Sequence, residues 1–178
     1  MTATAIPDVQ IGPVILAIRS RWQFTQEYTD LYAETARRAA NGSLYIRRAW
    51  GTKLQTQISG SGKLPFALAS LSTGGTHTIK CAAPRHVGSN SNVIDIPIGF
   101  RTGGIYTPIG WAIVDNRLVA TTLTMDSNTA TLAAVSGADG YQVAYFPEFV
   151  GHISELSETL DNDGTSHTYS WRVTIEEV

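Results

Sequence analysis

The sequence has little charge and almost no cysteine. Lys, Arg, Asp and Glu make up 16% of its 178 residues, against about 25% in an average soluble domain. This shortage indicates a surface that packs against neighbouring subunits, although a Ser- and Thr-rich β protein that stays soluble through neutral polar groups explains it equally well. The single cysteine, Cys81, excludes an intrachain disulfide and a multi-cysteine metal site, and it fits synthesis in a reducing cytoplasm.

Other absences argue against nucleic acids and membranes as partners. The net charge of −2 lacks the basic excess that a nucleic-acid surface needs. No apolar run approaches the roughly 20 residues that span a bilayer, and residues 1–8 lack the basic and then apolar pattern of a secretory signal. We therefore expect no nucleic-acid recognition and no membrane insertion.

Motifs for catalysis and metal binding are missing as well. The histidines form no HxH or HxxxH pair, and the sequence contains neither a serine nucleophile elbow nor a dinucleotide-binding loop. Asp161-Asn-Asp-Gly164 begins like a calcium loop but lacks the later ligands, so it predicts a tight turn. We expect Cys81 to be a small core residue and the chain to have no enzymatic activity, no cofactor and no metal site.

Short alternating runs of apolar and polar residues fill the sequence. Residues 110–114 and 117–124 are rich in β-branched residues, and Asp115-Asn116 between them suits a two-residue hairpin turn. Runs over 129–135 and 141–146 follow and predict a continuation as a β-meander. The sequence therefore predicts an all-β fold, an antiparallel sandwich or barrel with meander hairpins and at most one short helix, over residues 65–71.

Aromatic side chains recur on the apolar faces of these runs. In residues 166–175 Tyr169 and Trp171 alternate with polar neighbours, which predicts a closing core strand. The aromatic residues that we expect in the core are Trp22, Phe24, Trp111, Tyr141, Tyr145, Tyr169 and Trp171.

We expect residues 1–12 to form an extended N-terminal arm and residues 13–178 to form a single β-rich domain. The glycine-rich stretch at residues 73–76 is a candidate internal boundary. If the arm lies on a neighbouring subunit, deleting residues 1–8 should weaken assembly more than folding.

Residues 30–40 partly follow a helical period, but the Asn41-Gly42 pair that follows is a strong hairpin signal. We therefore favour two strands, one on each side of this turn. The hairpin would bring together Arg37, Arg38, Arg47 and Arg48, a candidate subunit interface or channel lining. Solvated strand faces and salt bridges are the alternative roles for these four arginines.

Several stretches together resemble structural proteins from the tails of tailed bacteriophages, of the distal-tail or baseplate tail-tip type. They cover most of the chain and include a "Tyr-x-Val-x-Tyr-x-Pro" strand and a late "Tyr-Ser-Trp" strand. The stretches are Asn41-Gly-Ser43 with Trp50-Gly-Thr-Lys53, Ile58-Ser-Gly-Ser-Gly62 with Pro65 and Leu68, Ile79–Arg85, Gly137–Pro147 and Tyr169–Arg172.

This resemblance implies a β-sandwich or barrel subunit made in the host cytoplasm and incorporated into the virion tail. In the distal-tail type, a homo-oligomeric ring, expected to be a hexamer, joins the tail tube to hub or fibre proteins. The family has no catalytic residues to carry over. The chain is shorter than many distal-tail proteins, so the resemblance does not extend to a separate carbohydrate-binding or fibre-docking domain.

Three rival functions remain open. A tail-tube or tail-terminator subunit would also be a β-rich ring former. A carbohydrate-binding β-sandwich module that contacts the host surface would expose Trp50 or Trp111 in a groove. A cell-wall hydrolase would require paired carboxylates or a zinc site.

Overall fold

The computed structural model describes residues 7–18, 23–49, 51–62, 68–162 and 167–178. Within these ranges the chain forms sixteen β-strands and two short 3-10 turns, η1 (Leu68–Ser70) and η2 (Gly104–Tyr106). The predicted all-β class is therefore confirmed, and η1 is the described part of the helix expected over residues 65–71. No helical segment in these ranges has the length and apolar character needed to cross a membrane.

The chain divides into two compact units, whereas the sequence predicted a single domain over residues 13–178. Each unit is assembled from segments far apart in the chain, because strands distant in sequence pair with one another. The chain passes between the units at 20/21, 65/66, 71/72, 76/77 and 150/151. Two of these crossings bracket the predicted boundary at 73–76, and the last lies inside strand β15 (Glu148–Asn162). The first unit comprises Met1–Ser20, Phe66–Leu71 and His77–Val150, and the second comprises Arg21–Pro65, Ser72–Thr76 and Gly151–Val178.

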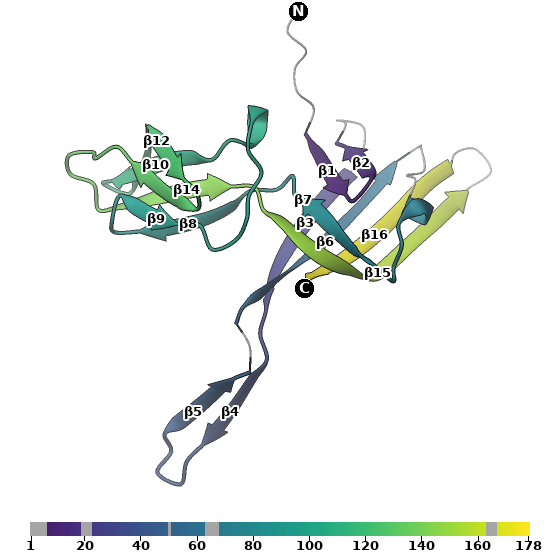
Figure 1. Cartoon of the computed structure of the whole chain (residues 1–178), viewed down its shortest axis with the longest axis horizontal. Coiled ribbons are helices and arrows are strands. Elements are labelled where there is room, and N and C mark those ends of the chain that lie inside the picture. Colours follow the sequence, from purple (N-terminus) through teal and green to yellow (C-terminus); the bar gives the residue numbers. More distant parts are fainter. Residues whose placement is uncertain (1–6, 19–22, 50, 63–67, 163–166) are drawn as a thin grey trace, which may run out of the picture. The chain divides into compact units, whose positions relative to one another are not determined.

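The first unit contains a small β-sandwich. One sheet has the strand order β11-β10-β14-β8 and the other has the order β12-β13-β9 (Figure 1). Both sheets contribute side chains to one hydrophobic core, in which Leu132, Val143 and Tyr145 are almost fully buried. The strands are β8 (Arg85–Ser89), β9 (Val93–Asp95), β10 (Ile109–Val114), β11 (Arg117–Thr121), β12 (Leu123–Asp126), β13 (Thr129–Leu132) and β14 (Gly140–Tyr145).

The hairpin predicted around Asp115-Asn116 is present. Strands β10 and β11 pair in register, and both turn residues have positive φ angles, 48° and 59°. The predicted meander is wrong, however, because the run 117–124 breaks at Thr122 and its last residues enter the other sheet as β12. The alternation of side chains continues across this break, so it does not reveal that the strand changes sheets.

Residues 8–11 form a buried strand and are not part of an extended arm. Strand β1 (Asp8–Ile11) pairs with β2 (Val14–Ala17) on one side and with β7 (Thr76–Lys80) on the other. Val9 and Ile11 are fully buried. Hydrophobic burial of these two side chains therefore fixes a segment that the sequence assigned to an arm. Residues 1–6 of that arm lie outside the described residues.

The second unit contains four long antiparallel strands. Gly151–Asn162 of β15 pairs with β16 (His167–Glu177), β16 pairs with β6 (Lys53–Gly62), and β6 pairs with β3 (Gln23–Leu31). One face of these strands is apolar and buried and includes Leu54, Ile58 and Trp171. The opposite face carries Ser, Thr, Gln, Glu and Arg side chains.

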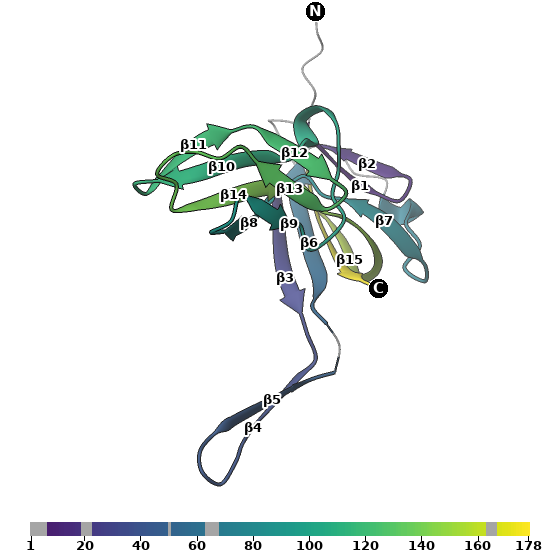
Figure 2. The ribbon, with the colours of Figure 1, turned by 60° about the vertical axis from the view of Figure 1, so that its left-hand side comes forward.

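A two-stranded hairpin extends the second unit beyond β3 and β6. Strands β4 (Glu34–Arg38) and β5 (Leu44–Arg48) pair over their whole length, which confirms the predicted hairpin. Every residue of both strands is exposed. Figure 1 and Figure 2 both show the hairpin continuing from β3 and β6 with no other described strand beside it.

Candidate functional site

The hairpin β4–β5 is closed by a turn that its sequence specifies. Gly42 adopts a φ of 82°, which glycine tolerates without steric cost. The Gly42 amide donates to the Ala39 carbonyl at 2.9 Å, and the Ser43 amide donates to Asn41 Oδ1 at 3.1 Å. These local bonds fix the register that brings the four arginines together.

One face of the hairpin combines three apolar side chains with an ion pair and a further arginine. Ala36 lies opposite Ile46, and Arg38 lies opposite Leu44. At the base of this face Arg48 Nε donates to Glu34 Oε2 at 3.0 Å, and the Arg48 guanidinium lies over the Tyr32 ring. Leu44 and Ile46 remain 54% and 47% exposed, so the described residues leave this face uncovered.

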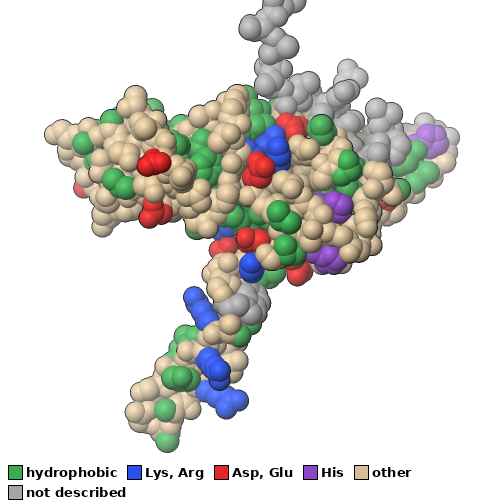
Figure 3. Space-filling view, in the orientation of Figure 1, with side chains coloured by type: hydrophobic (Ala, Val, Ile, Leu, Met, Phe, Trp, Pro, Cys, Tyr) green, Lys and Arg blue, Asp and Glu red, His purple; other side chains and the backbone are tan. Residues whose placement is uncertain are grey.

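The opposite face, formed by Thr35, Arg37, Tyr45 and Arg47, is cationic, and we call it the arginine face. Thr35 lies opposite Arg47 and Arg37 lies opposite Tyr45, so the two arginines are diagonal neighbours on this face. The four side chains line a hollow of about 260 Å³. Arg38 and Arg48 point to the other face, so the structure divides the predicted cluster of four into two pairs. Figure 3 shows the Lys and Arg side chains gathered along this hairpin.

Because both faces of the hairpin are exposed, the hairpin gains little stability from packing. A two-stranded hairpin without a third strand or a packing layer is only marginally stable in water. Leu44 and Ile46 place two large apolar groups in solvent on one face, and Tyr45, which is 66% exposed, places a third on the other face. Exposed apolar patches on soluble proteins mark sites of interaction. The hairpin is therefore the strongest candidate for a binding element in the described part of the chain.

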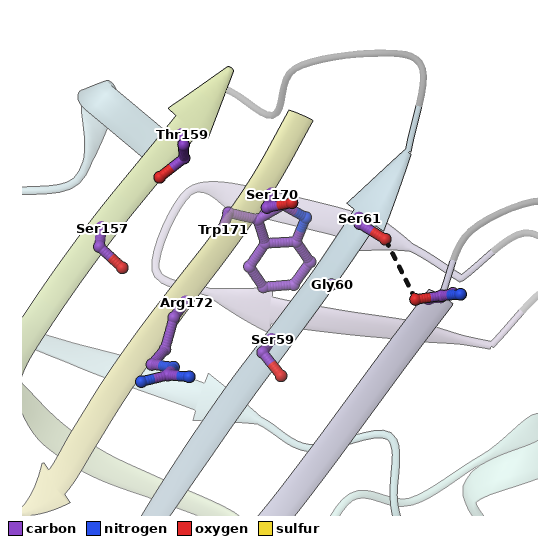
Figure 4. Close-up of a pocket in the computed structure, with 9 residues that line it drawn as sticks. Ser59, Gly60, Ser61, Ser157, Thr159, Ser170, Trp171 and Arg172 are labelled. Atoms are coloured by element: carbon purple, nitrogen blue, oxygen red, sulfur yellow. Dashed lines mark hydrogen bonds between the residues drawn. The ribbon is translucent and has the colours of Figure 1, made fainter. Parts of the chain in front are cut away.

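A second feature is a polar groove of about 390 Å³ on the four-stranded sheet of the second unit. Its walls are mainly hydroxyl-bearing side chains from β6, β15 and β16, with the Arg172 guanidinium at one side (Figure 4). Ser61 donates a hydrogen bond to Gln23 Oε1 at 3.4 Å across its edge. In Figure 4 the Trp171 ring lies beside Gly60. The lining residues are Gln23, Ser59, Gly60, Ser61, Ser157, Thr159, Ser170, Trp171 and Arg172.

A buried polar cluster anchors β1 within the first unit. Arg101, which is 8% exposed, donates to the Asp8 carbonyl at 2.7 Å, to the Cys81 carbonyl at 3.1 Å and to the Asp8 carboxylate at 3.2 Å. The Tyr106 hydroxyl accepts a hydrogen bond from the Asp8 amide at 2.6 Å. The Arg101 guanidinium also lies 3.4 Å from the centre of the Tyr106 ring. Sequence reasoning missed this cluster, because Asp8 and Arg101 are 93 residues apart and no local pattern links them.

The acidity of the Tyr106 phenol is altered by its surroundings in this cluster. Burial raises the pKa of its phenol above the ordinary value of 10.0, and the nearby Asp8 carboxylate acts in the same direction. The Asp8 backbone hydrogen bond and the Arg101 charge oppose this increase. The phenol therefore remains protonated as a structural hydrogen-bonding group, and its contacts are all with the protein's own atoms.

The aromatic residues predicted for the core fall into three groups. Tyr141, Tyr145 and Trp171 are buried, whereas Phe24, Trp111 and Tyr169 are half-buried. The Trp111 ring lies 6.3 Å from the His86 ring, centre to centre, on the β10 side of the sandwich. Trp22 and Trp50 lie outside the described residues.

The described residues do not assemble a reactive centre. Cys81 is buried, and its carbonyl accepts a hydrogen bond from Arg101. Within the described ranges, no three His, Cys, Asp or Glu side chains lie close enough together to hold a metal ion. The arginine face and the polar groove are therefore the features available for binding. Comparisons with protein-family models, curated proteins and solved structures found no match for this chain.

Proposed function

We propose that this chain is a non-enzymatic structural subunit of a tailed-phage virion. It forms a homo-oligomeric ring, a hexamer, at the tail tip or baseplate and links the tail tube to hub or fibre proteins. The proposal rests on the resemblance of the sequence to tail structural proteins and on one structural observation, the fully exposed hairpin β4–β5.

The hairpin supports an assembly role for energetic reasons. Every residue of its two strands is exposed, and each face presents two arginines together with apolar or aromatic side chains. Docking against another subunit would remove about half of this surface from water and would supply partners for the guanidinium groups. Apolar burial contributes about 25 cal/mol for each Å² removed from water. Arginine suits such contacts because its planar guanidinium binds carboxylates in bidentate fashion.

Negative-stain electron microscopy of the purified protein tests this proposal. We expect closed rings of uniform diameter. Open tubes would move the assignment to a tail-tube subunit, and particles with the size of a single chain at high concentration would contradict self-assembly.

A carbohydrate-binding module is the second candidate, and the polar groove favours it. Ser and Thr hydroxyl groups and the Arg172 guanidinium could donate and accept hydrogen bonds with sugar hydroxyls or an acidic sugar. The exposed tryptophan platform expected for this function is not provided by Trp111, which is half-buried in the sandwich. Glycan-array binding that is abolished by Arg172→Ala and retained in Arg37→Ala would favour this module over the ring.

A further inference from the structure

The four arginines of the hairpin differ in their partners. Arg48 pairs with Glu34, and Arg38 Nη1 donates to the Gly42 carbonyl at 3.0 Å. Arg37 and Arg47, on the arginine face, form no salt bridge with any carboxylate among the described residues. Among the described residues, this face therefore presents two cations without a counter-charge, Arg37 opposite Tyr45 and Arg47 opposite Thr35.

A complementary row of side chains crosses the polar face of the four-stranded sheet. Glu27 lies opposite Gln57, Gln57 lies opposite Thr174, and Thr174 lies opposite Glu155. We call these four residues the acidic row. Both glutamates are exposed, and neither pairs with a cation among the described residues. Thr174 Oγ1 donates to Glu155 Oε2 at 3.3 Å and holds that carboxylate over the sheet.

The charged residues in the two neighbouring rows do not neutralise the negative charge of the acidic row. In the registered rows of this face, Arg172 lies one row away on the side of the polar groove. Glu176 lies one row away on the other side, where it accepts a hydrogen bond from Gln55 at 3.1 Å. The three neighbouring rows thus carry three carboxylates and one guanidinium.

The acidic row is longer than the backbone separation of the two arginines, and the long arginine side chains span the difference. The acidic row crosses three interstrand spacings, about 14 Å at about 4.8 Å each. Arg37 and Arg47 are a diagonal pair about 7–8 Å apart at their Cα atoms, and their long side chains can extend outward to the two glutamates. Tyr45 is the direct cross-strand partner of Arg37 and lies two residues from Arg47 along β5. Gln57 and Thr174 lie between the two glutamates, and the Thr174 side chain is buried against Glu155.

We infer that the arginine face of one copy docks on the acidic row of a second copy of this chain. The inference rests on the proposed function, because it describes the contact that builds the ring. It joins different surfaces of the two copies, and such a head-to-tail contact repeats around a closed ring when the rotation between subunits permits closure. Within one chain the arginine face remains fully exposed, so the docking requires a second molecule.

Charge reversal in the full-length chain tests this docking. One variant carries Arg37→Glu and Arg47→Glu, a second carries Glu27→Arg and Glu155→Arg, and a third carries all four changes. The first two should each lose assembly by at least about tenfold in dissociation constant. The third, which keeps the net charge at −2, should reassemble. A mixture of the first two should also reassemble, into rings with an even number of subunits. Arg117→Glu with Leu118→Glu and Thr124→Glu, the same change in net charge at exposed positions of β11 and β12, is the matched control and should assemble normally.

Disulfide trapping tests the same docking without charge reversal, so it does not depend on whether the reversed variants fold. Tyr45→Cys in one chain and Gln57→Cys in another place thiols at the centres of the two surfaces. Under oxidation the mixed chains should form a cross-linked dimer, whereas Arg38→Cys, on the opposite hairpin face, should not trap with Gln57→Cys. Rings that form normally from folded reversed variants, with no trapping, would overturn the docking and leave the ring itself standing. A wild-type chain that stays monomeric at high concentration would overturn both.

Discussion

At the scale of single residues, the packing of Trp171 requires glycine at position 60. The Trp171 ring packs against Gly60, its partner across the β16–β6 pair. A Cβ atom at residue 60 would lie 2.7 Å from the Gln23 carbonyl oxygen and 2.7 Å from Trp171 Cζ2. Glycine is therefore required for the tryptophan to reach its buried position.

We predict that Gly60→Ala lowers the free energy of unfolding by about 1–3 kcal/mol, because the added methyl group overpacks the sheet. Trp171→Ala should lower it by about 3–5 kcal/mol through loss of a buried aromatic side chain. Gly88→Ala is the matched control, since a Cβ atom there meets Tyr141 only at 3.4 Å. Urea unfolding of the three variants measures these differences, and equal stabilities for Gly60→Ala and Gly88→Ala would contradict the packing argument.

The Asp8–Arg101 pair is predicted to hold β1 in place. Arg101→Met should lower the free energy of unfolding by about 2–3 kcal/mol, because it leaves a partly buried carboxylate without its charged hydrogen bonds. Arg117→Met, at an exposed site on β11, should change it by less than about 0.5 kcal/mol. Chemical denaturation measures both. A deletion of residues 1–8 should also impair folding, since it removes Asp8 as well as the expected arm.

The Tyr106 phenol predicts a pH dependence. Its pKa is raised in the folded state, so the unfolded chain loses this proton first, at about pH 10. The stabilisation is therefore complete below about pH 10 and is lost as the pH rises through the folded pKa. The stability difference between wild type and Tyr106→Phe should shrink above pH 10. Tyr45→Phe, at an exposed site, is the control for general effects of alkaline pH on stability. A stability difference between wild type and Tyr106→Phe that stays constant above pH 10 would contradict the raised pKa of Tyr106.

At the scale of elements, the sequence predicts turns and strands better than it predicts which strands pair. Asp115-Asn116 and Asn41-Gly42 specify their turns through local backbone preference, and both hairpins are present. The switch between sheets at Thr122 and the burial of β1 depend on partners distant in the chain, which the alternation of side chains does not encode. The four arginines could be assigned to one hairpin because the turn between them is local. Glu27 and Glu155 were not predicted to lie in one row, because long-range strand pairing brings them together.

The hairpin itself should be dispensable for folding. Replacing residues 34–48 by a short glycine–serine linker removes two strands in which every residue is exposed. A surface loop changes stability only weakly with its length, so we expect a free energy of unfolding within about 1 kcal/mol of wild type. Thermal and urea unfolding measure this, and a large loss of stability would show that the hairpin belongs to the fold and not to an interface.

At the scale of the whole molecule, the low charge and the exposed hairpin agree on one account. A chain with 16% charged residues places two arginines that have no carboxylate partner among the described residues, and several apolar side chains, on an exposed hairpin. Exposure of the apolar side chains to water is unfavourable, and burying them in a contact with another subunit would stabilise that contact. The described residues offer polar grooves and hairpin faces for binding, and they do not bring together groups typical of a catalytic centre.

The most direct test is the native mass of the full chain and of the chain with residues 34–48 replaced, measured by light scattering at the same concentrations. The account predicts a discrete oligomer, a hexamer, for the wild type and a monomer of unchanged fold for the shortened chain. A shortened chain that retains the wild-type mass would contradict the central claim that the hairpin builds the assembly.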